Sequence, residues 1–320
     1  MGALVEVRSL VKHFPVRGGV LNRVIGRVHA VNDVSFQVQR GEVLGVVGES
    51  GCGKSTLGKC VIRLQEPTAG EVLYEGRPIT GLSHSELMPY RRKMQIIFQD
   101  PYSSLNPRMT VRAILKEVLT FHRLASGAAL EERIRSLIEK VGLRPEAADK
   151  FPHEFSGGQR QRIGIARALA LDPEFLVADE PVSALDVSIQ AQVLNLMMDL
   201  REEFGLTMLF VSHDLKVVEH FCDRVIVMYL GHIMEEIACE DLQERSIHPY
   251  TRALLGANPI NDPDERRPLT VLEGDVPSPY DPPKGCPFAG RCSIASDRCR
   301  SEMPPLETRS DSWRVACFEV

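Results

Sequence analysis

The stretch GESGCGKSTL, Gly48–Leu57, decides the fold of this chain. Four residues separate Gly48 from Gly53-Lys54-Ser55, and the stretch directly follows the apolar segment EVLGVV. A glycine-rich turn between a buried strand and a helix lets backbone N–H groups surround phosphate oxygens, and the helix N-terminus favours negative charge. The spacing therefore predicts a nucleotide phosphate loop, with Lys54 on the β- and γ-phosphates and the Ser55 hydroxyl on Mg²⁺. The context of strand and helix argues against the alternative, a chance glycine turn.

The composition is that of an ordinary globular protein. The 320 residues are 43% hydrophobic and 25% charged, with a net charge of -5, which argues against nucleic-acid binding driven by phosphate electrostatics. No apolar run approaches the roughly 18 residues of a membrane span, and MGALVEVRSL lacks the basic start of a signal peptide. We therefore expect a cytoplasmic protein whose eight cysteines are thiols or metal ligands rather than disulfides.

The order of hydrophobic patterns predicts an α/β fold with a mainly parallel, doubly wound sheet. Prolines and cysteines become frequent after about His248, so we place a boundary near residue 245 and expect a small, loop-rich C-terminal extension. The patterns predict buried strands at 42–47, 94–98, 175–179 and 207–212, a hairpin at 70–79, and helices at about 54–64, 111–121, 129–143 and 188–204.

Polar side chains follow three of these strands. FLVADE ends in Asp179, which is placed to contact Mg²⁺, and Glu180, which is placed to act as general base on water. His213 is placed to contact the γ-phosphate, and the Gln99 amide can ligate Mg²⁺ and orient water. The alternatives are a solvated acidic turn, a structural histidine and an exposed loop glutamine.

A second anion site is predicted in FSGGQRQRIGIARAL, where Ser156, Gly157 and Gly158 open a helix. One chain does not need two γ-phosphate sites for one ATP. Two chains facing head to tail would use both, because each would bring its phosphate loop to the other chain's Ser-Gly-Gly.

Taken together, these motifs resemble the ATP-binding subunits of ABC transporters over about residues 4–245, with Phe155 where many members have leucine. The resemblance implies an ABC-type P-loop NTPase: a RecA-like core with an antiparallel β-subdomain and a helical subdomain at about 105–165, forming a domain at 1–245 before the extension at 246–320. The motifs that carry it, in chain order, are Gly48–Thr56, Gln99, Ser156–Gln159, Phe175–Glu180, Ser183–Asp186 and His213.

The resemblance also implies a full set of ATP and Mg²⁺ contacts. From the pattern alone, Phe14 is as well explained by core packing as by stacking on the nucleotide base, and the resemblance favours stacking. Mg²⁺ would be held by Ser55, Gln99 and Asp179. The ATP contacts would be Phe14, Gly48, Ser50, Gly51, Gly53, Lys54, Ser55 and Thr56 from one chain, and Ser156, Gly157, Gly158, Gln159 and Asp186 from the facing chain.

Four cysteines form a separate cluster in the sequence, with gaps of five, six and seventeen residues. Structural zinc favours cysteine pairs two to four residues apart, disulfides suit a cytoplasmic protein poorly, and a [4Fe–4S] cluster tolerates varied spacing. The spacing alone predicts only a four-thiolate metal site, whose charge Arg291, Arg298 and Arg300 could offset. Another cysteine, Cys52, lies in the phosphate loop, where oxidation would block ATP. The four ligands would be Cys286, Cys292, Cys299 and Cys317.

The segment HPYTRALL, His248–Leu255, followed by GCPFAGRC, is similar to the tail of oligopeptide and dipeptide importer ATPases, and most similar to the second ATPase subunit of the dipeptide type. This resemblance implies a [4Fe–4S] cluster, with Zn²⁺ as the alternative. It implies an ATPase at the cytoplasmic face of the inner membrane that powers import of di- and oligopeptides. Its partners would be two transmembrane permease subunits, a sister ATPase or a second copy, and indirectly an extracytoplasmic peptide-binding protein.

Three other functions compete with peptide import. The same machinery could import nickel or another small solute. A soluble ABC ATPase acting on DNA or ribosomes would show coiled-coil inserts, a tandem ATPase unit or a basic face, and the sequence shows none of these. A binding module without hydrolysis conflicts with the presence of Glu180 and His213.

Overall fold

The structure is a computed structural model that describes residues 2–19, 22–257, 274–310 and 313–320. The chain divides into two compact units. The first unit comprises residues 1–38, 43–80 and 212–320, and the second comprises residues 39–42 and 81–211.

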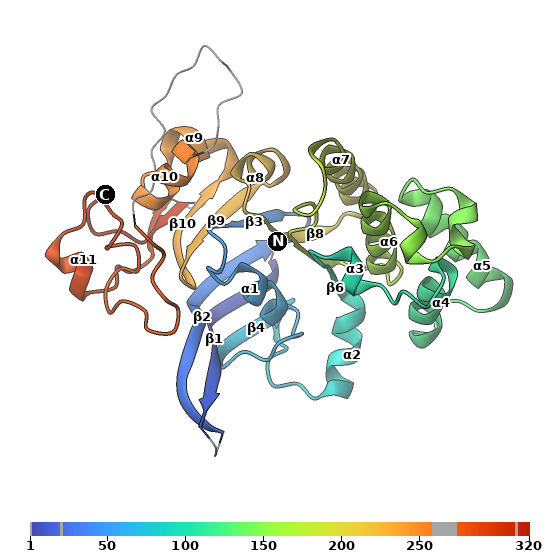
Figure 1. Ribbon diagram of the computed structural model, residues 1–320, viewed down its shortest axis with the longest axis horizontal. Coiled ribbons are helices and arrows are strands. Elements are labelled where there is room, and N and C mark those ends of the chain that lie inside the picture. The colour runs from blue at the N-terminus through green and yellow to red at the C-terminus, as the bar shows by residue number, and fades with distance from the viewer. Residues whose placement is uncertain (1, 20–21, 258–273, 311–312) are drawn as a thin grey trace, which may run out of the picture. The chain divides into compact units, whose positions relative to one another are not determined.

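In the first unit, a four-stranded sheet has the order β2-β1-β4-β5. Its long strands β1 and β2 are the blue ribbons of Figure 1. Strands β1 and β4 are antiparallel, with Val5 opposite Tyr74. The antiparallel pair β4 and β5 confirms the predicted hairpin, which turns at Glu75 and Gly76, both with positive φ. The bounds are β1 Ala3–Gly18, β2 Arg23–Gln39, β4 Ala69–Tyr74 and β5 Arg77–Pro78.

The other strands of the first unit run in the order β11-β12-β10-β9-β3. Strand β3 is parallel to β9, with Gly45 opposite Val225, and all five of its residues are buried, as the apolar run predicted. Strand β10 is antiparallel to both β9 and β12. The bounds are β3 Val43–Val47, β9 Arg224–Tyr229, β10 His232–Ala238, β11 Glu307–Ser310 and β12 Trp313–Val315.

The helix behind the phosphate loop is shorter than predicted. Helix α1 ends at Val61 rather than near Leu64, because Arg63 adopts a φ of 56°, which no right-handed helix accommodates. The helical bounds of this unit are α1 Lys54–Val61, α8 Leu215–Phe221, η3 Cys239–Asp241, α9 Leu242–Arg245, α10 Pro249–Ala257 and α11 Asp297–Ser301.

In the C-terminal extension, the described part is mostly irregular, as its prolines suggested. The extension also adds strands β11 and β12 to the sheet beside β10. The sequence pattern did not predict these two strands. Glu235 of β10 lies opposite Val315 and accepts a hydrogen bond from the Trp313 indole. The boundary at residue 245 stays a prediction, and residues 258–273 and 311–312 lie outside the described residues.

The second unit contains three parallel strands in the order β8-β7-β6, which confirms three of the predicted buried strands. Strands β7 and β8 are completely buried. Because the strands are parallel, the residues that follow them meet at one edge of this sheet. The bounds are β6 Met94–Ile97, β7 Phe175–Asp179 and β8 Thr207–Val211.

Helices α4, α5 and α6 of the second unit pack against one another and appear together in green (Figure 1). Helix α4 buries Ile114, Leu115 and Leu119, which share one face at helical spacing. The helical bounds are α2 His84–Lys93, α3 Pro101–Ser104, α4 Val111–Phe121, α5 Gly127–Lys140, η1 Pro145–Asp149, η2 Pro152–Glu154, α6 Gly157–Leu169 and α7 Val187–Phe204.

Candidate functional site

The phosphate loop requires glycine at two of its positions. Gly48 and Gly53 have φ values of 152° and 104°, and a Cβ atom would lie 2.1 Å from the Met228 carbonyl oxygen at Gly48 and 2.0 Å from the Ala30 carbonyl oxygen at Gly53. Any side chain there would displace backbone, so the loop keeps a close-fitting conformation. The loop leads from β3 into α1, the context that the motif predicted.

The Lys54 side chain lies back across this loop. Its Nζ donates hydrogen bonds to the carbonyl oxygens of Gly48, at 2.7 Å, and Glu49, at 3.1 Å. The residue is only 4% exposed, so its ammonium group is held at one place by the loop itself. This arrangement presents a fixed positive charge to an anion bound in the loop.

At its N-terminus, helix α1 is ready for an anion. Its N-cap is Gly53, no side chain caps it, and its first turn carries no acidic residue. Ser55 and Thr56 are half-buried in that turn. Free N–H groups and the helix dipole therefore both favour a negative ligand there.

Phe14 belongs to β1 in the same unit and is half-buried, with the Lys12 ammonium 4.9 Å from its ring centroid. The ring is therefore partly accessible to solvent. His213, also in this unit, follows Val211 and Ser212 and is exposed. Neither observation tests the role that the sequence suggested.

In the second unit, the structure brings Gln99 and Glu180 together. The Gln99 Nε2 donates a 2.9 Å hydrogen bond to Glu180 Oε2, although the residues lie 81 positions apart. Glu180 has a φ of 47°, an uncommon conformation for glutamate, and its N–H bonds the Val211 carbonyl oxygen at 3.0 Å. Asp179, the last residue of β7, is 3% exposed. The Asp179 carboxylate is thus buried, whereas the Glu180 carboxylate is held by the Gln99 amide.

The Ser-Gly-Gly motif starts helix α6. Ser156 caps the helix: its hydroxyl accepts from the Gln159 N–H at 3.4 Å, and the Gln159 amide oxygen accepts from the Ser156 N–H at 3.1 Å. A Cβ at Gly158 would lie 2.3 Å from the Ile189 side chain. Phe155, the departure from the family pattern, is buried at 7% exposure and packs rather than facing solvent.

The surface around this motif is open. Ser156, Gly157 and Gln159 are exposed, and so is Asp186, the N-cap of α7. Beside Asp186, Val187 is 81% exposed, which is unusual for an apolar side chain.

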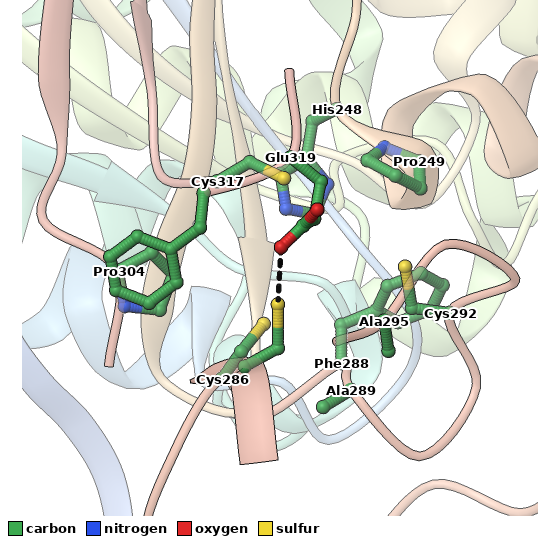
Figure 2. Close-up of a pocket in the computed structure, with 12 residues that line it drawn as sticks. His248, Pro249, Cys286, Phe288, Ala289, Cys292, Ala295, Pro304, Cys317 and Glu319 are labelled. Carbon is green, nitrogen blue, oxygen red and sulfur yellow. Dashed lines mark hydrogen bonds between the residues drawn. The ribbon is translucent and has the colours of Figure 1, made fainter. Parts of the chain in front are cut away.

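The four predicted cysteine ligands line one pocket of the first unit. The atom-free space inside this pocket is about 290 Å³, and His248, Phe288 and Glu319 also border it. Figure 2 shows Cys286, Cys292 and Cys317 reaching the pocket from separate parts of the chain. Cys299 Sγ lies 3.7 Å from Glu319 Oε1, the contact drawn as a dashed line in Figure 2. Burial raises the pKa of the Cys286 thiol to about 11.

All eight cysteines are free thiols. Across the described ranges, no group of three or more histidine, cysteine or acidic side chains is placed to hold a single metal ion. The four cysteines therefore share one pocket, but in the described residues they are not arranged to hold a metal ion.

Two expectations about single residues are wrong. Arg291 does not offset charge in the cysteine pocket, because its guanidinium pairs with Glu49 of the phosphate loop. Cys52 is not poised for oxidation: it is 3% exposed, and burial raises the pKa of its thiol. Cys60, Cys222 and Cys239 are buried, as expected for small core residues.

Two family models match this chain. The model for the ABC transporter matches residues 31–183, and the model for the oligopeptide/dipeptide transporter C-terminal region matches residues 234–299. In the part of the chain that the structure covers, no helix has both the length and the apolar character to cross a bilayer.

Similar proteins agree with these models. The chain is 54% identical to a probable peptide ABC transporter ATP-binding protein of Sinorhizobium fredii, over 98% of this chain and 89% of that protein. It is 51% identical to the oligopeptide transport ATP-binding protein AppF of Bacillus subtilis (98% and 96% covered) and 50% identical to the dipeptide transport ATP-binding protein DppF of Haemophilus influenzae (99% and 97%).

Solved structures define the same class. A dimeric ATP-binding cassette in a post-hydrolysis state with ADP and phosphate aligns with a TM-score of 0.65 and 30% identity, over 73% of this chain and 98% of that one. The ABC transporter component cbiO1 of Clostridium perfringens aligns with a TM-score of 0.64 and 25% identity, over 77% and 92%. The fold and the phosphate loop thus define an ABC-type P-loop ATPase. More narrowly, the chain belongs to the family of ATP-binding subunits of oligopeptide/dipeptide ABC transporters.

Proposed function

We propose that this chain hydrolyses ATP to power the import of di- or oligopeptides through separate membrane subunits. The observation that carries the proposal is the phosphate loop, in which Gly48 and Gly53 leave no room for a side chain and the backbone holds the Lys54 ammonium group. The named functions of the relatives, peptide and dipeptide transport, support the substrate class.

ATP would bind through the N–H groups of Gly48–Thr56. Lys54 would exchange its two carbonyl contacts for the β- and γ-phosphates, a stronger charge-assisted pairing. The half-exposed ring of Phe14 would stack on adenine. Ser55, Asp179 and Gln99 offer the oxygen ligands that Mg²⁺ prefers, and the ion would neutralise charge developing on the phosphates.

Hydrolysis would use Glu180 as general base. The Gln99 amide already orients the Glu180 carboxylate. Gln99 could therefore contact Mg²⁺ at the nucleotide and also position the general base. His213, exposed after β8, would contact the γ-phosphate. The positive φ of Glu180 is strain of the kind that active sites retain.

A second ATPase chain would complete each site. Ser156, Gly157, Gly158 and Gln159 would contact the γ-phosphate of ATP held by the facing chain, and Asp186 would lie at the interface. The exposure of Ser156, Gly157, Gln159, Asp186 and Val187 supports this arrangement. The facing chain would be a sister ATPase or a second copy. ATP would close the pair and hydrolysis would open it.

The membrane partners would be two permease subunits, fed by an extracytoplasmic peptide-binding protein. The helical segment 105–165 would dock on the permeases, and the chain would lie at the cytoplasmic face of the membrane. Gln99 would link ATP occupancy to that surface.

Peptide import predicts a specific loss of uptake. Cells whose native copy is replaced by the Lys54→Ala variant should take up a labelled dipeptide at background rate, because the membrane subunits lose their ATP supply. Uptake of the corresponding free amino acid is the control and should not change. Normal dipeptide uptake, with nickel or another solute lost instead, would refute the substrate class.

Cys286, Cys292, Cys299 and Cys317 would hold a [4Fe–4S] cluster, which supplies four iron–thiolate bonds that tie separate loops together. The four thiols that line one pocket support this donor set.

The cluster predicts about four iron and four sulfide per chain after anaerobic purification, with a broad absorbance band near roughly 400 nm. Cys292→Ser should lower the iron content and the melting temperature, whereas Cys60→Ser, outside the pocket, should keep the full iron content. Zinc without iron in the wild-type protein would mean that the four cysteines hold Zn²⁺ instead of a [4Fe–4S] cluster.

A further inference from the structure

Glu49, in the phosphate loop, is held by a residue 242 positions away. Both carboxylate oxygens accept hydrogen bonds from the Arg291 guanidinium, Oε2 from Nη1 at 2.6 Å and Oε1 from Nη2 at 3.0 Å. The Arg291 side chain is 7% exposed and that of Glu49 is 26% exposed. This bidentate geometry fixes the direction as well as the distance of the carboxylate.

The backbone of Glu49 is fixed too. Its N–H donates to the Tyr250 hydroxyl oxygen at 2.8 Å, and its carbonyl oxygen accepts from Lys54 Nζ at 3.1 Å and from the Cys52 N–H at 3.2 Å. The backbone of Glu49 thus connects Lys54 of the phosphate loop to Tyr250 in the C-terminal part of the chain.

Aromatic packing supports this connection. The Tyr250 ring centroid lies 4.8 Å from that of Tyr229 and 5.2 Å from that of Phe288. Arg291 also donates to the Tyr229 hydroxyl at 3.3 Å. Since Phe288 and Arg291 both lie between the first two pocket cysteines, residues 286–292 pack directly behind the phosphate loop.

Charge gives the contact a consequence for ligand binding. A carboxylate beside a loop that binds a triphosphate repels that ligand, and a guanidinium paired to it removes the repulsion. We propose that Arg291 is a positioning residue for ATP binding, which acts by holding and neutralising Glu49. The proposal rests on the proposed function of the loop as the ATP site.

The test uses Arg291→Gln, which removes the charge and leaves a shorter polar side chain with an amide donor, in the otherwise complete protein. ATP affinity should fall about tenfold, because the Glu49 carboxylate then carries an unpaired negative charge within the phosphate loop. The KM for ATP should rise with little change in kcat at saturating ATP. Arg291→Lys should restore most of the affinity. Arg298→Gln is the matched control: it lies in the same segment, pairs with Glu302 and should bind ATP as the wild type does.

The double variant Arg291→Gln with Glu49→Gln decides the mechanism. If Arg291 acts through Glu49, removing the carboxylate suppresses the defect, and the double variant binds ATP more tightly than Arg291→Gln alone. Additive losses, or a lower melting temperature with unchanged ATP affinity, would give Arg291 a purely structural role and overturn the proposal. Absence of ATP binding by the wild-type protein would instead refute the proposed function. The Lys54→Ala variant gives the signal of a protein without bound ATP, against which the wild type is compared.

Discussion

Replacement of Glu180 by glutamine is expected to lower ATP turnover by about 10²- to 10⁴-fold, the usual contribution of a general base. ATP binding should survive, because the phosphate loop and Lys54 are unchanged. The amide has nearly the shape of the carboxylate, so the bond with Gln99 can re-form. Bound ATP would then persist and hold two chains together. Phosphate release and size-exclusion chromatography with ATP measure the two effects.

Glu174→Gln is the matched control for this prediction. Glu174 stands directly before β7, at the opposite end from Glu180, and pairs with Arg40 and Lys93 on the surface. Its loss should leave turnover near the wild-type rate, since exposed ion pairs contribute little. Full ATPase activity in the Glu180→Gln variant would remove Glu180 from the catalytic role.

Two variants that are inactive alone are expected to regain activity when mixed. Lys54→Ala removes the phosphate-binding charge and should weaken ATP binding, whereas Ser156→Arg places a bulky cation at the second anion site. In a mixed pair, the intact loop of the Ser156→Arg chain faces the intact Ser-Gly-Gly of the Lys54→Ala chain. With random pairing and independent sites, the mixture should recover about a quarter of the wild-type rate.

The phosphate-release rate of each variant alone and of their mixture checks this expectation. Lys59→Ala, on the same helix as Lys54 but in its last turn, should neither abolish activity nor require mixing. Wild-type turnover by Ser156→Arg alone would mean that one chain contains the whole site, and no recovery on mixing would mean that two copies of this chain do not share a site.

Much of the fold could be predicted from local patterns. Short apolar runs such as Val43–Val47 and residues 175–178 favour buried strands, and the glycine spacing after the first predicts a phosphate loop in which Gly48 and Gly53 leave no room for a side chain. The Gln99 and Glu180 side chains could be predicted to meet, because parallel strands end at one edge. The end of helix α1 could not, since nothing in the residue type of Arg63 indicates its positive φ.

Contacts between distant segments were beyond the sequence. An arginine flanked by cysteines suggests charge compensation within its own segment, and nothing in the pattern connects Arg291 to Glu49 or to Tyr250. Strands β11 and β12 were also missed, because three or four residues rich in charge carry no alternation to read. The roles of the site residues remain predictions that the variants above test.

Native mass spectrometry of the Glu180→Gln variant in ATP and Mg²⁺ tests the shared site most directly, because it counts chains and nucleotides in one species. If two chains share the ATP sites, the spectrum should show two chains with two ATP molecules, and a single chain once ATP is removed. A single chain carrying ATP, or a pair that forms equally well without nucleotide, would contradict the shared site.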